Sequence, residues 1–225
     1  TLYSKTVVTD DQGRYVIPDL PAAEYDVWVR GYGLVDSPKV NASPGQTLDL
    51  DAVIAPDAAA AAAYYPAGHW YSLMEIPDKS NFPGTGNDGN GISPNINNQA
   101  DFMRRVSSGG CLACHQLGNA ATRTIPNLFS GYDTSVEAWT RRVQSGQAGG
   151  SMSGALAGMG DRTIQMYADW TDRIANGELP PAPERPSGVE RNVVITQWDW
   201  ADTKAYLHDV ASTDRRDPTV NAYGK

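Results

Sequence analysis

Cysteine, histidine and phenylalanine are scarce in this chain of 225 residues, which contains two, three and three of them, respectively. Both cysteines fall within the five-residue segment 111–115, so none is left for a structural disulfide elsewhere. The histidines outside that segment, His69 and His208, lie far from it and from each other. This distribution excludes a disulfide-rich scaffold and argues against a zinc site built from paired ligands.

The sequence also lacks long apolar runs and basic clusters. Its longest uniform stretch is the alanine run 58–63, far short of the ~20 apolar residues that a membrane helix needs. With 26 acidic and 18 basic side chains the formal charge is −8, which disfavours binding to nucleic acid or to an anionic membrane. Glycine (22) and proline (15) are abundant, which predicts many loops.

Alternating apolar and polar residues predict β-strands in the first quarter of the chain. Tyr25, Val27 and Val29 fall on one face of an extended segment, and residues 48–52 alternate in the same way. Turn-forming residues separate these runs. We therefore expect residues 1–55 to form a small antiparallel β module.

Four motifs within this module carry a family resemblance: TDDQGRY at 9–15, LP at 20–21, YDVWV at 25–29 and GYG at 31–33. Together they resemble the carboxypeptidase regulatory-like, or transthyretin-like, β-sandwich. Such sandwiches usually have about seven strands. The segment is too short for all of them, so we expect N-terminal strands to be missing and Thr1 to lie within a longer natural domain.

Residues 56–97 show no sustained periodicity, and we expect them to form an ordered crossover between two domains. The alanine run fits either a linker or a short helix. The later stretch at 87–91 has the Asn, Asp and Gly residues of a calcium loop, but it has too few carboxylates and no closing glutamate. These features favour a plain loop.

Three short helices are predicted after the crossover. Phe102 and Val106 lie on one face of the first, which ends at a pair of glycines. A Thr-x-x-Glu capping box at 134–137 predicts the start of the second. The third begins near Asp161, carries apolar residues at spacings of three and four, and ends at Gly177.

Beyond these helices, residues 183–225 are predicted to be extended. Residues 193–200 have a strand-like pattern, and 203–209 are typical of a helical turn. The β module is small and incomplete, so it buries too little surface to fold well alone. We therefore expect this C-terminal segment to pack back on the β module, on the helical domain, or on both.

Cys111, Cys114 and His115 form the Cys-x-x-Cys-His sequence that attaches c-type haem. Two thiols add to the two vinyl groups on one edge of the porphyrin, and the imidazole of the next residue then lies under the iron. The alternative interpretation is a thioredoxin-like redox pair. That pair needs the strand-to-helix context of a βαβ unit, whereas here the motif is flanked by glycine-containing segments. The motif predicts one covalent haem c.

With the three helices around this motif, residues 98–182 resemble a class I cytochrome c. The family order is helix, haem motif, proline-containing loop, middle helix, glycine-rich loop with methionine, and final helix. The resemblance implies that the Pro126 carbonyl accepts a hydrogen bond from Nδ1–H of His115, which fixes the tautomer of that iron ligand. One departure is visible: the stretch between Phe102 and Cys111 is longer than in minimal cytochromes.

Two methionines are candidates for the second axial ligand. Met152 lies in a glycine-rich stretch, 37 residues after His115, and Met159 follows 44 residues after it. In class I cytochromes a short turn and then most of the last helix follow the ligand methionine, which favours Met152. His69, His208 and an open coordination site are the remaining alternatives.

These patterns predict a multidomain α and β protein. We expect a partial antiparallel β-sandwich at 1–55, a crossover at 56–97, an all-α class I cytochrome c domain at 98–182 and an extended C-terminal segment at 183–225. The whole resembles carboxypeptidase regulatory-like proteins of Proteobacteria that join such a sandwich to a cytochrome c and continue into a streptogramin-lyase-like β-propeller.

The resemblance implies one-electron transfer by an exported bacterial protein, periplasmic or extracellular, because haem is attached covalently outside the cytoplasm. Expected partners are redox proteins, such as a dehydrogenase or another cytochrome, with assembly through the β module. No nucleophile-elbow or zincin signature supports hydrolytic chemistry. If His115 and Met152 both bind the iron, no site is left for a substrate, which favours electron transfer with no substrate turnover of its own. The alternatives are the electron-accepting domain of a larger oxidoreductase and a structural or adhesive module that haem stabilises.

Overall fold

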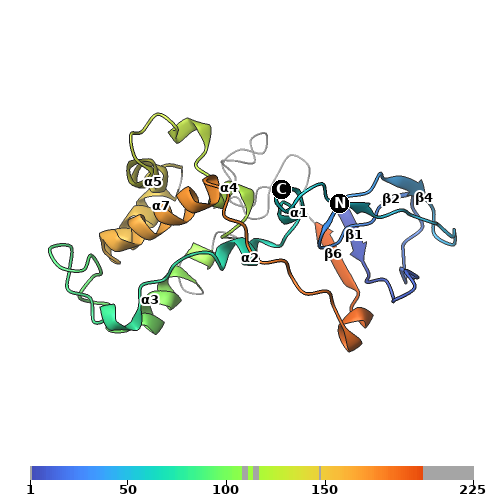
Figure 1. Ribbon diagram of the computed structural model, residues 1–225, viewed down its shortest axis with the longest axis horizontal. Helices are drawn as coiled ribbons and strands as arrows, with labels where there is room; N and C mark the ends of the chain where they lie inside the picture. The colour runs from blue at the N-terminus through green and yellow to red at the C-terminus, as the bar shows by residue number, and fades with distance from the viewer. Residues whose placement is uncertain (1, 108–110, 114–116, 147, 200–225) are drawn as a thin grey trace. The chain divides into compact units, whose positions relative to one another are not determined.

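The computed structural model describes residues 2–107, 111–113, 117–146 and 148–199 (Figure 1). The described residues divide into two compact units, one formed by 2–65 with 181–199 and the other by the described residues of 66–180. We call their described parts the β unit and the helical unit. The described residues form seven α-helices and three two-stranded antiparallel sheets, so the expected mixture of α and β structure is confirmed.

The β unit contains three separate strand pairs, all antiparallel. Their members are β1 (Leu2–Thr6) with β6 (Ile195–Asp199), β2 (Tyr25–Val27) with β4 (Val40–Ala42), and β3 (Leu34–Val35) with β5 (Val53–Ile54).

Two predicted strands of this unit differ from the observed ones. The prediction at 48–52 is wrong, because the residues that pair with β3 are Val53 and Ile54. The alternation that begins at Tyr25 continues to residue 29, but β2 ends at Val27. Val29 instead exchanges hydrogen bonds with Ser37, donating to its hydroxyl at 2.9 Å and accepting from its amide at 3.0 Å. The choice of partner, rather than the alternation, sets where each strand ends.

The C-terminal segment returns to the β unit, as predicted. Strand β6 pairs with β1 over five residues, from Leu2 opposite Asp199 to Thr6 opposite Ile195, and Figure 1 shows the two strands side by side. The predicted strand at 193–200 is thus observed at 195–199, whereas residue 200 and the helical turn predicted at 203–209 lie outside the described residues.

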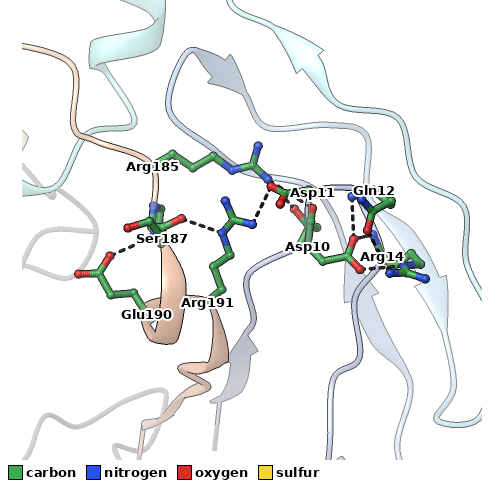
Figure 2. Close-up of polar contacts among 10 residues, drawn as sticks. Asp10, Asp11, Gln12, Arg14, Arg185, Ser187, Glu190 and Arg191 are labelled. Atoms are coloured by element: carbon green, nitrogen blue, oxygen red, sulfur yellow. Dashed lines mark hydrogen bonds and ion pairs between the residues drawn. The ribbon is translucent and has the colours of Figure 1, made fainter.

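Polar contacts between the turn at 10–14 and the segment 185–191 hold this segment on the β unit (Figure 2). We call these contacts the clasp. Arg191 Nη1 lies 2.6 Å from Asp11 Oδ1, while its Nε donates to the Pro186 carbonyl at 3.1 Å. Arg185 reaches the Thr9 hydroxyl at 3.5 Å. The segment itself is ordered by the 3₁₀ helix η4 (Gly188–Asn192).

Few residues of the β unit are buried. Within its described residues they are Ser37, Ala42, Ala61, Ala62 and Tyr65. The alanine run forms the short helix α1 (Ala58–Ala62), whose N-terminus is capped by the Asp57 carboxylate accepting from the Ala60 amide at 2.8 Å. Of the two interpretations of this run, a linker or a short helix, the structure shows the short helix.

The helical unit contains the three predicted helices. Asn98 caps α3 (Gln99–Val106), the Thr134 and Glu137 capping box starts α5 (Ser135–Val143), and α7 spans Asp161–Ala175. Helix α3 ends before the two glycines at which its end was predicted, and those glycines lie outside the described residues. The remaining elements are α2 (Ala67–Tyr71), η1 (Lys79–Asn81), η2 (Cys111–Ala113), α4 (Ala120–Arg123), η3 (Asn127–Phe129) and α6 (Gly149–Ala157). Among the helices described in either unit, none has the length and apolar character needed to span a membrane.

Helix α6 corrects one expectation, because the glycine-rich stretch with Met152 was predicted to be a loop. It is helical from Gly149 to Ala157 and packs against both α5 and α7. Gly149 permits the close approach to α5, since a Cβ at this position would lie 2.3 Å from the Gln144 carbonyl oxygen. Burial of Leu156 against the core stabilises the helix despite its glycines.

The core of this unit also includes residues from the expected crossover. Ile92 and Ile96 are completely buried beside Phe102, Trp139 and Trp170. The loop that carries these isoleucines is held against the α6–α7 junction by hydrogen bonds that include Asn87 Oδ1 accepting from the amide of Asp161 at 3.1 Å. The second half of the crossover therefore belongs to the helical unit, and the loop at 87–91 serves as a cap for α7.

Candidate functional site

The residues of the predicted haem motif are described only in part. Cys111 begins η2 and is half-buried, and Leu117 after the motif is buried. Cys114 and His115 lie outside the described residues, as does His208. The positions of the second thiol and of the proximal imidazole therefore stay predictions.

Cys111 is hydrogen-bonded to one tyrosine of the helical core and packs against the same apolar cluster as a second one, Tyr71. The buried Tyr167 hydroxyl donates to Cys111 Sγ at 3.2 Å, and the Tyr167 ring stacks on Trp139 with centroids 4.9 Å apart. Burial raises the pKa of Tyr167 well above its usual value. Burial, and to a smaller extent the nearby Cys111 sulfur, raises the pKa of Tyr71 as well. The motif thus starts at an aromatic wall formed by α2, α5 and α7.

Both candidate methionines pack on the same apolar cluster as Cys111. Met152 is half-buried on α6, and Met159 is 3% exposed just before α7. The backbone of Met159 is fixed, because its carbonyl accepts from the Ser93 amide at 2.9 Å. Cys111, Met152 and Met159 therefore all pack in or against one apolar cluster. The choice between the two methionines as iron ligand stays a prediction.

Pro126 is buried and opens η3, where its carbonyl accepts from the Phe129 amide at 2.8 Å. A carbonyl oxygen has two lone pairs, so this bond leaves room for a second donor. The predicted donor, His115, is outside the described residues, and the bond between them stays a prediction. The neighbouring Ile125 packs against the apolar cluster.

The segment that follows the motif is packed tightly under α2. Gly118 has φ +94°, and a Cβ there would lie 1.9 Å from the Ala67 carbonyl oxygen. Its amide donates to the Thr122 hydroxyl at 2.9 Å, while Asn119 caps α4 by accepting from the Thr122 amide at 2.9 Å. Only glycine allows both this φ and this approach, so position 118 fixes how the chain leaves the motif.

Two arginines hold this segment, and the sequence interpretation did not identify them. Arg123 Nη1 donates to the Gly118 carbonyl at 2.8 Å, and Arg142 Nη1 donates to the Thr124 carbonyl at 2.8 Å. A tryptophan three residues before Arg142 on a helix was the available signal, because i, i+3 neighbours on a helix lie close enough for a cation–π contact.

The side chains of the cluster against which Cys111 packs are mostly apolar and aromatic. Within the described residues, the buried Tyr71 hydroxyl and the buried Thr163 Oγ1 have no hydrogen-bond partner. Buried hydroxyls are normally satisfied, and Tyr71 packs against the same cluster as Cys111, so its hydroxyl is a group that a molecule bound there would satisfy. Together with the soft sulfur ligands that Met152 and Met159 offer, this environment is compatible with haem.

Other features of the unit do not form a competing site. In the part of the chain that the structure describes, which excludes Cys114 and His115, no three His, Cys, Asp or Glu side chains are grouped to hold a metal ion. Two surface depressions of about 470 and 320 Å³ lie along α3 and α5 and are lined by neither Cys111 nor either candidate methionine.

Comparisons with protein-family models, with curated proteins and with solved structures find no match to this chain.

Proposed function

We propose that this protein carries single electrons by means of one covalently bound haem c. The observation that supports the proposal most is the Cys-x-x-Cys-His sequence at 111–115, the only place in the chain with cysteine. The structure adds that Cys111 lies on an apolar cluster shared with two methionines. A thioredoxin-like pair would follow a strand and open a helix, whereas Cys111 follows α3 and begins a 3₁₀ turn.

Each residue has a distinct proposed role. Cys111 and Cys114 would hold the group through thioether bonds, and His115 would bind the iron. The Pro126 carbonyl would accept from the His115 imidazole and fix its tautomer. Met152 is the proposed second axial ligand. When bound, the haem supplies a reversible Fe(III)/Fe(II) couple, and two axial protein ligands leave no iron position for a substrate.

The proposed fold follows the family resemblances. Residues 98–182 would form a class I cytochrome c domain, and residues 1–55 a partial carboxypeptidase regulatory-like sandwich. Haem attachment outside the cytoplasm places the protein in the periplasm or outside the cell. Its partners would be redox proteins that give or take one electron.

A mass measurement tests the proposal. The intact protein, produced in a host that attaches haem c, should exceed the polypeptide mass by one haem, and the colour should stay with the protein after acid–acetone extraction. Cys111→Ala together with Cys114→Ala should abolish both results. Extractable haem, or the bare polypeptide mass, contradicts the proposal.

The ligand assignment has its own test. Ferric haem with a methionine ligand has a weak far-red charge-transfer band, which Met152→Ala should abolish while Met159→Ala leaves it. The reverse pattern would assign the iron to Met159. Absence of the band from the wild-type protein would point to a histidine or an open site.

A second candidate function is the electron-accepting domain of a larger oxidoreductase. It is favoured by apolar side chains that the β unit leaves uncovered: Val16, Ile54 and Val189 are 78, 80 and 82% exposed. Each of these side chains would be buried if another chain covered it, as assembly with an oxidoreductase would require. Co-purification of the native protein with a dehydrogenase, at a fixed ratio and resistant to salt, would favour this alternative over a free electron carrier.

A further inference from the structure

Arg142 of α5 is fastened to the segment that follows the motif. It donates to the carbonyls of Thr124 at 2.8 Å and of Thr122 at 3.5 Å, and it also contacts the Ala121 carbonyl. Arg123 holds the Gly118 carbonyl from within the same segment. Backbone carbonyls thus take the place of carboxylates as partners of both cations.

Each guanidinium also lies against an indole ring. Arg142 Cζ is 4.6 Å from the centroid of Trp139, and Arg123 Cζ is 4.1 Å from that of Trp70. Arg142 is half-buried as a residue, but protein atoms surround its guanidinium, and this burial lowers its pKa to about 10. Burial lowers the pKa of Arg123 too. Arg142 therefore remains a cation at neutral pH.

Neither cation is neutralised nearby. Across the described ranges, the ion pairs of the helical unit involve Arg104, Arg105 and Arg173, but neither Arg123 nor Arg142. A guanidinium that has no carboxylate partner and is partly enclosed by protein atoms is screened less by solvent and salt than a fully exposed one, so its field extends over a longer distance.

Three successive contacts join this charge to the start of the motif. Arg142 lies on the Trp139 ring, Trp139 stacks on Tyr167 at 4.9 Å, and the Tyr167 hydroxyl is 3.2 Å from Cys111 Sγ. The path runs through packed aromatic side chains rather than water. The positive charge of Arg142 is therefore part of the environment of whatever is attached to Cys111.

We propose that Arg142 sets the reduction potential of the attached haem, as a fixed positive charge that favours the ferrous state, with Arg123 as a weaker second charge. The inference rests on the proposed function. Ferric haem carries one positive charge more than ferrous haem, so a nearby cation disfavours oxidation and raises the potential. Arg142 acts through its charge in this proposal and takes no part in electron transfer itself.

The experiment is a spectroelectrochemical titration of the full-length haem protein and three variants. Arg142→Gln removes the charge but keeps hydrogen-bonding capacity, and it should lower the ferrous-to-ferric ratio at a fixed potential about tenfold, a shift of about 59 mV for one electron. Arg142→Lys keeps the charge and should stay near the wild-type potential. Arg141→Gln is the matched control, since Arg141 is its exposed neighbour, and it should leave the potential unchanged.

The charge account and a structural account give different results. If Arg142→Lys shifts the potential as much as Arg142→Gln, the hydrogen bonds from Arg142 to the backbone carbonyls, and not its charge, control the potential, and the proposal is overturned. An unchanged potential in Arg142→Gln, with the far-red band intact, overturns it as well. Should Arg142→Gln fail to retain haem, Arg123→Gln tests the same electrostatics and must lower the potential by a smaller amount.

Failure of the proposed function would be recognised separately. A wild-type protein without covalent haem has no potential to measure and contradicts the cytochrome interpretation itself. A wild-type protein with covalent haem whose potential ignores Arg142 and Arg123 contradicts only the present inference.

Discussion

The β unit and the helical unit are stabilised in different ways. The helical unit has a continuous core in which Phe102, Val106 and Trp170 are completely buried. The β unit has strand pairs of two to five residues, few buried side chains and a polar clasp at its surface. Residues 1–57 also hold nine acidic and four basic side chains, so self-repulsion opposes their compaction. Apolar burial dominates one unit, whereas strand pairing and polar contacts dominate the other.

This difference predicts unequal responses to removing one tryptophan from each unit. Trp170 is completely buried, and its Nε1 donates to the Trp70 carbonyl at 2.9 Å. Trp170→Ala should destabilise the helical unit by about 3–5 kcal/mol. Trp28 of the β unit is half-buried under Lys39, whose Nζ is 4.8 Å from the ring, and Trp28→Ala should cost about 1 kcal/mol.

Urea unfolding followed by circular dichroism at helix wavelengths measures the first change, and hydrogen exchange in the β unit measures the second. Equal losses in the two variants would show that the β unit has a core comparable to that of the helical unit.

The next prediction concerns the packing that holds the exit from the motif. Gly118→Ala introduces a Cβ 1.9 Å from the Ala67 carbonyl oxygen at a φ of +94°, and it should destabilise the helical unit by about 2–4 kcal/mol. Gly177→Ala is the matched control: it has φ +96° and open space around the new Cβ, so it should cost about 1 kcal/mol. Similar losses in thermal melts of both variants would mean that α2 does not press on Gly118.

The contrast also explains which elements could be predicted from the sequence. Helices α3, α5 and α7 combine an amphipathic period with local start or stop signals, and those signals act within one turn. Helix α6 has no side-chain cap and three glycines, so its stability comes from packing against α5 and α7. Strands β3 and β5 are two residues long and exist only because they pair with each other. Local sequence patterns do not identify pairing partners that are distant in the sequence.

The candidate site divides in the same manner. The motif at 111–115 is contiguous, so sequence reading finds it directly, whereas its surroundings come from distant elements. Tyr167 contacts Cys111 from a helix that follows it, and Tyr71, from a helix that precedes it, packs against the same cluster. Arg142 contacts carbonyls about twenty positions earlier. No spacing rule links these residues, and only the folded chain brings them together.

A smaller effect is expected from opening the clasp of the β unit. Arg191 and Asp11 form a pair at 2.6 Å, with the Asp11 side chain 67% exposed. Exposed pairs contribute little, so Arg191→Ala should destabilise the unit by about 0.5 kcal/mol. The change should nevertheless speed amide exchange in β1 and β6, because the clasp holds the segment that leads into β6. A double-mutant cycle with Asp11→Ala isolates the energy of the pair. A coupling energy of zero would show that the Arg191–Asp11 pair does not stabilise the β unit.

The smallest effect is the pH response of the turn that carries Asp11. Hydrogen bonds from the Arg14 backbone and side chain and from the Gln12 amide lower the pKa of Asp10 below its usual 3.8. A carboxylate whose pKa is lower in the folded state stabilises that state above the unfolded pKa, and the contribution is lost as the pH falls through the folded pKa. The turn should therefore loosen only below about pH 3.8. An NMR titration of the Asp10 carboxyl should give a midpoint below that of a model aspartate. Asp10→Asn should remove this step and leave the turn equally loose at neutral pH, whereas a midpoint at or above 3.8 would show that the hydrogen bonds to Asp10 do not persist in solution.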